Sequence, residues 1–218
     1  MTNSLKHERV EPRWPVALGI LILLLLVKLV PDHIQILPNW GPFVLVAPAL
    51  LAMAVARLSA DQDRFLRVER VILLAFAVIL LGLTASSVVV LVRHILGGGA
   101  ALGGLQLLAS SVVAWFCNVF GFALVYWQLD GGGPSARRRR ISERPDWLFP
   151  TAPTDGPDDW RPLFVDYLFL AFSTATAFST TDTVPLTARA KLLMMLEAIK
   201  SLAIMVVVAS RAVNVLAT

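Results

Sequence analysis

Six runs of apolar residues, separated by shorter polar segments, set the pattern of this chain. The runs cover residues 14–30, 43–56, 60–92, 105–129, 162–173 and 188–216. A helix needs about 20 apolar residues to cross the hydrocarbon core of a bilayer, and several of the runs reach or approach that length. The pattern therefore predicts an all-α polytopic membrane protein with five to six transmembrane helices.

The composition supports this class of protein. Of the 218 residues, 57% are hydrophobic and 16% are charged, whereas soluble domains have about 45–50% apolar and about 25% charged residues. The net charge of +4 is modest, and the arginines lie beside the apolar runs, which is typical of topology signals and not of nucleic-acid binding. We expect an integral membrane protein, such as one of the bacterial inner membrane.

Side chains that could act in catalysis or bind a metal are few and scattered. A lone cysteine, Cys117, excludes an intrachain disulfide and any multi-cysteine metal site. The histidines His7, His33 and His94 lie far apart in the chain, and no nucleophile or phosphate-binding motif is present. The sequence therefore predicts no metal site, no cofactor and no enzymatic activity.

The alternation of apolar and polar segments predicts four parts. Residues 1–13 form a polar N-terminus, and residues 14–129 form a four-helix membrane domain with a charged connector at 57–70. Residues 130–161 are rich in Gly, Pro, Asp and Arg, which is typical of a flexible linker. Residues 162–218 contain the last two apolar runs.

The fourth run carries small and polar side chains at helical spacing on one face. They are Ser111, Trp115, Asn118 and Gly121. Polar groups within hydrocarbon are expected to face protein, so this face is predicted to pack against the C-terminal pair of helices. Tyr126 and Trp127, at the end of the run, predict an aromatic belt at the membrane interface.

The linker contains four consecutive arginines, Arg137, Arg138, Arg139 and Arg140. One interpretation is a cytoplasmic tether, in line with the positive-inside rule. The other is a lipid-surface site that contacts anionic headgroups, at about 1 kcal/mol for each arginine near the surface.

Three polar residues lie on one stripe of the last run: Glu197, Lys200 and Ser201. Glu197 and Lys200 are three residues apart, which predicts an ion pair. A charge at mid-membrane costs at least about 2.5–3.5 kcal/mol, so these residues are expected to face protein or water. Two alternatives remain open, the polar wall of a pore and a structural contact between paired helices.

A hydroxyl-rich stretch joins the last two runs. Its residues are Thr176, Ala177, Phe178, Ser179, Thr180, Thr181 and Asp182, with Pro185 three residues later. The stretch resembles the pore helix, filter and inner helix of the potassium and tetrameric cation channel superfamily, with the pattern T-x-T-T-V-G-Y-G-D-x-x-P. Ser179 and Thr181 stand in place of both filter glycines. Because alternate filter residues need left-handed backbone angles, these replacements argue against an ordinary carbonyl filter.

The resemblance implies a re-entrant pore-like hairpin at 162–218 and an assembly of several chains, four in that superfamily. It implies an ion-channel-like protein that passes monovalent cations through a hydroxyl-lined pore, with Asp182 at one mouth. The alternative is a non-conducting scaffold, sensor or partner subunit that keeps the fold. Membrane lipids are expected partners in both cases, and nucleic acid is not.

The charge pattern and the resemblance disagree about orientation. The alternation of basic and non-basic connections places the N-terminus and residues 130–161 in the cytoplasm, whereas the segment before the pore helix of potassium channels is extracellular. Three resolutions are open. The pore loop enters from the cytoplasmic face, as in the inverted pores of glutamate receptors; residues 162–181 cross the membrane completely; or the charge count does not set the orientation of so long a loop.

Overall fold

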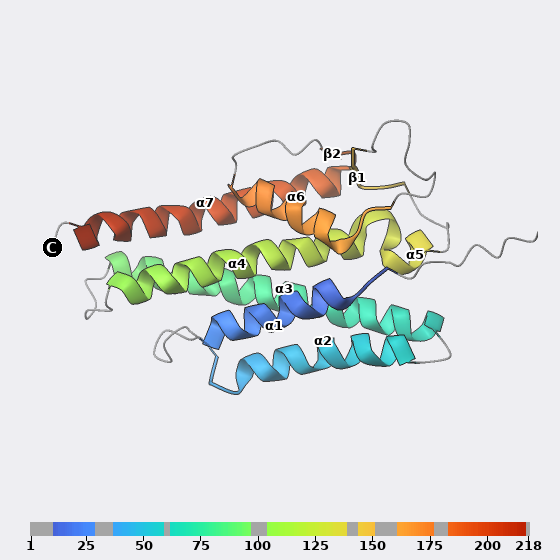
Figure 1. Ribbon diagram of the computed structural model, residues 1–218. Helices are drawn as coiled ribbons and strands as arrows, with labels where there is room; N and C mark the ends of the chain where they lie inside the picture. The colour runs from blue at the N-terminus through green and yellow to red at the C-terminus, as the bar shows by residue number, and fades with distance from the viewer. Residues whose placement is uncertain are drawn as a thin grey trace, which may run out of the picture.

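The computed structural model describes residues 11–28, 37–58, 62–96, 104–138, 144–150, 161–176 and 183–216. Within these ranges the chain forms six helices of 13 residues or more, each on one of the predicted apolar runs (Figure 1). They are α1 (Trp14–Lys28), α2 (Gly41–Leu58), α3 (Gln62–Leu96), α4 (Gly104–Leu129), α6 (Phe164–Thr176) and α7 (Ala188–Leu216). The prediction of an all-helical chain is confirmed for the described residues.

Four segments are long and apolar enough to cross a membrane. They are Gly41–Leu58, Arg64–Val90, Leu108–Arg137 and Ala188–Ala209, whereas the apolar helices α1 and α6 are shorter. The outward faces of these segments are strongly apolar, with Leu51, Val71 and Leu202 each at least 65% exposed. Glu197 and Asn118 are completely buried. Apolar side chains outside and polar side chains inside suit a bundle whose surroundings are hydrocarbon.

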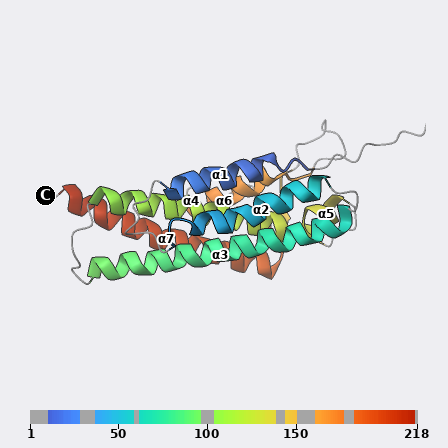
Figure 2. The same ribbon diagram turned by 90° about the horizontal axis from the view of Figure 1, so that it is seen from below.

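Helix α4 is the centre of the bundle. It packs against α1, α3, α6 and α7, and its membrane segment is 67% buried, whereas those of α3 and α7 are 22% buried. In the view of Figure 2 the helices run along one common axis, with α1, α2 and α3 nearest the viewer. The hydrophobic core therefore follows α4 along the length of the molecule.

Helices α6 and α7 run in the same direction. Phe164 and Phe172 of α6 make edge contacts with Trp127 and Trp115 of α4, so residue numbers fall on α4 as they rise on α6. The hydrogen bonds from Tyr126 to Glu197 and from Asn118 to Ser201 show the same relation for α7. Both helices are thus antiparallel to α4, and both begin at the same end of the bundle (Figure 1).

A glycine turn brings the chain back onto the end of α4. Gly131, Gly132 and Gly133 all have positive φ, between 54° and 90°, which L-residues with a side chain rarely adopt. A Cβ at Gly133 would also lie 2.8 Å from the carbonyl oxygen of Gln128. The short helix α5 (Pro134–Arg138) follows, and β1 (Trp147–Leu148) then pairs with β2 (Val184–Pro185) just before α7.

We call the end where α1, α3, α6 and α7 begin the basic end. The pairs Arg13–Glu69 and Arg70–Gly132 join the starts of α1 and α3 to each other and to the turn after α4. Among the described residues, the basic ones at this end include Arg13, Arg57, Arg64, Arg67, Arg70, Arg137, Arg144, Arg161, Arg189 and Lys191. Helices at the opposite end carry Lys28, Arg93 and Arg211.

Candidate functional site

A group of polar side chains joins the middle of α7 to α4 and α3. The Tyr126 hydroxyl donates a hydrogen bond of 2.5 Å to Oε2 of Glu197, and both residues are completely buried. The ammonium of Lys200, on the neighbouring face of α7, donates to the Leu81 carbonyl and the Thr84 hydroxyl of α3, at 2.6 Å each. Oε1 of Glu197 has no hydrogen-bond partner among the described residues.

The sequence-based pairing of Glu197 with Lys200 is wrong in detail. Each of the two takes its partners from another helix, and no ion pair within 4.0 Å joins them in the described part of the chain. The neighbouring Ser201 accepts a 2.9 Å hydrogen bond from Nδ2 of Asn118. The structure thus places Glu197, Lys200 and Ser201 in contacts between helices of one subunit.

The predicted polar face of α4 divides between the C-terminal helices and α3. Trp115 and Asn118 contact α6 and α7, through the ring of Phe172 and the hydroxyl of Ser201. Gly121 faces α3, because a Cβ at this position would meet the side chain of Leu81 at 2.8 Å. The prediction that this face packs on the C-terminal helices is therefore correct for Trp115 and Asn118 and wrong for Gly121.

The start of α6 is held by the turn that follows α4. The buried carboxylate of Asp130 accepts a 2.6 Å hydrogen bond from the Tyr167 hydroxyl and another of 2.6 Å from the backbone N–H of Asp146. At the first turn of α6, Asp166 accepts a hydrogen bond from the Leu163 N–H, which satisfies one of the unpaired donors of the helix start. The position of Asp166 is thus explained by capping.

The start of α7 is held by the segment around β1. The completely buried Asp146 accepts hydrogen bonds at 2.6 and 2.7 Å from Nε and Nη2 of Arg189, and its Oδ1 also accepts the Thr187 hydroxyl at 2.5 Å. Such two-pronged arginine–carboxylate contacts fix geometry as well as adding energy. Asp130 and Asp146 together hold the starts of α6 and α7.

Most of the filter-like residues lie outside the described residues. These are Ala177, Phe178, Ser179, Thr180, Thr181 and Asp182. Thr176 is the last residue of α6, and its hydroxyl donates within its own helix, to the Phe172 carbonyl at 3.0 Å and the Ser173 carbonyl at 3.2 Å. The Thr176 hydroxyl is therefore hydrogen-bonded to the backbone of its own helix.

The prediction of a lipid-surface arginine is wrong for Arg137. This side chain is 8% exposed, and its guanidinium donates to the Trp127 and Asp130 carbonyls, at 3.0 and 2.7 Å, and pairs with Glu11. Carbonyls at the end of a helix lack partners within the helix, and Arg137 supplies one. The side chain of Arg138 and the residues Arg139 and Arg140 lie outside the described part.

Several important side chains were missed or misplaced by the sequence patterns. Tyr126 and Trp127 are completely or almost completely buried and do not form an aromatic belt. Asp130 and Asp146 lie in the segment interpreted as a flexible linker, but the described parts of that segment pack on α4, α6 and α7. The one sequence signal for Asp130 was its position, an acidic residue directly after a long apolar run.

Comparisons with protein-family models, with curated proteins and with solved structures found no match to this chain.

Proposed function

We propose that this protein is an integral membrane protein with a channel-like pore module, in which α6, residues 177–182 and α7 form a re-entrant loop and an inner helix. The shared direction of α6 and α7 is the observation that carries this proposal. Helix α6 has 13 residues, about 20 Å of helix against a hydrocarbon core of about 30 Å. A short helix whose chain returns to its starting end is the arrangement of a pore loop.

The proposed orientation places the basic end in the cytoplasm. Arginines and lysines concentrate at that end, where both α6 and α7 begin, and the positive-inside rule assigns such an end to the cytoplasm. Among the three resolutions of the topology conflict, this arrangement favours a pore loop that enters from the cytoplasmic face.

The proposed module passes monovalent cations through a pathway lined by hydroxyl groups. The C-terminal end of α6 carries the negative end of the helix dipole, which favours cations. Asp182 supplies a charge at one mouth, and the serine and threonines of 177–182 supply oxygens. The pathway requires several copies of the chain around an axis, four by the resemblance.

A flux assay tests this proposal. The purified protein is reconstituted into liposomes loaded with a potassium- or sodium-sensitive dye, and the size of the detergent-solubilised complex is measured in parallel. The wild-type complex should be a tetramer that passes cations, and Asp182→Asn should lower the flux by about threefold or more while leaving the complex intact, because charge at a pore mouth raises the local cation concentration. Asp63→Asn, the same chemical change in the charged connector, is the matched control.

A second candidate function is favoured by the internal contacts of α7. Glu197, Lys200 and Ser201 are all engaged within one subunit, and the outward residues Leu192, Ile199 and Leu202 are apolar. These features suit a non-conducting scaffold or partner subunit. A monomer without cation flux would support this second function and would count against the pore.

A further inference from the structure

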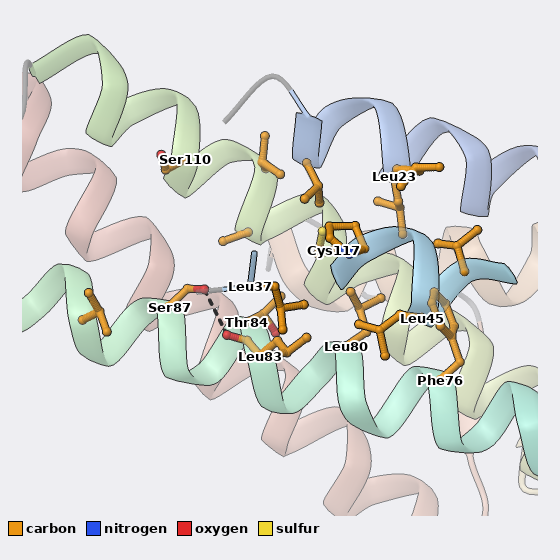
Figure 3. Close-up of a pocket in the computed structure, with 17 residues that line it drawn as sticks. Leu23, Leu37, Leu45, Phe76, Leu80, Leu83, Thr84, Ser87, Ser110 and Cys117 are labelled. Carbon is orange, nitrogen blue, oxygen red and sulfur yellow. Dashed lines mark hydrogen bonds between the residues drawn. The ribbon is translucent and has the colours of Figure 1, made fainter. Parts of the chain in front are cut away.

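A cavity lies between α1, α2, α3 and α4 (Figure 3). Its volume is about 140 Å³. Most of its wall is hydrocarbon, contributed by residues such as Leu23, Leu45, Phe76, Leu80 and Ala114. An apolar wall of this kind favours an apolar guest over water, so it specifies hydrophobic chemistry.

The hydroxyl groups in the wall of the cavity are already engaged. Ser87 donates to the Leu83 carbonyl of its own helix at 3.0 Å, which is the dashed line in Figure 3. Thr84 donates to the Leu81 carbonyl at 3.0 Å and accepts the ammonium of Lys200. A polar ligand would find these groups occupied, which again favours an apolar guest.

A positively charged residue, Lys28, directly follows a wall residue in the sequence. Val27 and Pro42 line the cavity, and each is adjacent in sequence to a residue of a cation–π pair, in which Lys28 Nζ lies 4.9 Å from the ring of Phe43. The same ammonium donates to the Asn39 carbonyl at 2.5 Å. An ammonium has three donors, so this one retains capacity for an anionic oxygen.

We propose that this cavity binds the end of an acyl chain whose anionic headgroup lies at Lys28. In a bilayer, acyl chains surround the helices, and an unfilled cavity would lose the dispersion contacts that a chain end restores. The ligand class is an amphiphile with one anionic head, supplied either by an anionic phospholipid or by a free fatty acid. The site does not depend on the proposed pore.

Photo-crosslinking tests the site. The protein is placed in phosphatidylcholine vesicles that contain a small fraction of a probe with a diazirine near the chain end. The probe is phosphatidylglycerol, palmitic acid or, as the neutral control, phosphatidylcholine, and labelled residues are mapped by mass spectrometry. We expect labels to concentrate on wall residues of α3 and α4, and excess unlabelled phosphatidylglycerol or palmitic acid to suppress them. The probe that labels saturably identifies the source.

Two substitutions and one matched control sharpen this test. Ala114→Phe fills the cavity and should lower labelling of the wall by about fivefold or more, whereas Val112→Phe, at a 41% exposed position of the same helix, should leave it unchanged. Lys28→Gln should lower labelling by the anionic probes by about threefold and leave the neutral probe unaffected.

Clear outcomes would overturn the proposal. Labelling that is equal in the wild type and Ala114→Phe, or that rises in proportion to probe without saturating, would show ordinary contact with the bilayer. Equal labelling by neutral and anionic probes would remove the headgroup assignment. If Ala114→Phe does not fold, saturation by unlabelled amphiphile in the wild type decides.

Discussion

Glu197 has one bonded carboxylate oxygen and one without a partner among the described residues, so its single bond to Tyr126 matters more than usual. Tyr126→Phe removes the hydroxyl and leaves a buried carboxyl group with no described partner. We expect the free energy of unfolding to fall by about 1–3 kcal/mol, the cost of an unsatisfied buried polar group. Unfolding in detergent micelles with increasing SDS or urea measures this change.

The neighbouring pair Asn118–Ser201 provides the control for that measurement. Asn118→Ala should cost about 0.6–2 kcal/mol, as interhelical hydrogen bonds in membranes do. Asn118 and Tyr126 are about 12 Å apart along α4, so the double variant should show nearly additive losses. Strong coupling between the two pairs, or a negligible effect of Tyr126→Phe, would contradict the assignment of separate contacts.

At the scale of elements, the contact of Asp146 with Arg189 attaches the segment before β1 to the first turn of α7. Asp146→Asn keeps the shape of the side chain and removes its charge. We expect a loss of about 1–3 kcal/mol, concentrated in local opening of residues 144–150, because Arg189 is half-exposed and retains water as a partner. Hydrogen exchange of peptides that cover 144–150 and 183–190 measures this opening.

The control for the Asp146 experiment lies on the same helix. Lys191 is an exposed residue of the first turn of α7, and Lys191→Gln removes a charge without removing a described contact. Its exchange pattern should match that of the wild type. If Asp146→Asn also matches the wild type, the contact of Asp146 with Arg189 does not stabilise the start of α7.

The helices were predictable from the sequence, because each apolar run forms one helix. The partners of polar residues were not. The spacing of Glu197 and Lys200 describes neighbours on one helix, whereas their hydrogen bonds go to α4 and α3. Composition likewise suggested a mobile linker, but Gly131 to Gly133 turn the chain so that Arg137 reaches the end of α4. Contacts of this kind depend on tertiary geometry, which local patterns do not contain.

On the scale of the whole molecule, the two ends of the bundle differ in charge. The pore-loop proposal predicts which segments lie on the same side of the membrane. If α6 re-enters, the chain just before α6 and the chain just before α7 lie on the same side of the membrane. If α6 crosses completely, they lie on opposite sides. Accessibility of single cysteines therefore separates the two arrangements.

Cys117 is buried and 3% exposed, so the wild-type chain serves as the unlabelled control. Leu58→Cys marks the basic end, Trp40→Cys marks the opposite end, and Leu163→Cys and Val184→Cys mark the starts of α6 and α7; all four positions are at least 41% exposed. With a membrane-impermeant maleimide, intact cells should label Trp40→Cys, and the other three should label only after permeabilisation. If Leu163→Cys follows Leu58→Cys while Val184→Cys follows Trp40→Cys, α6 spans the membrane and the chain has no pore loop there.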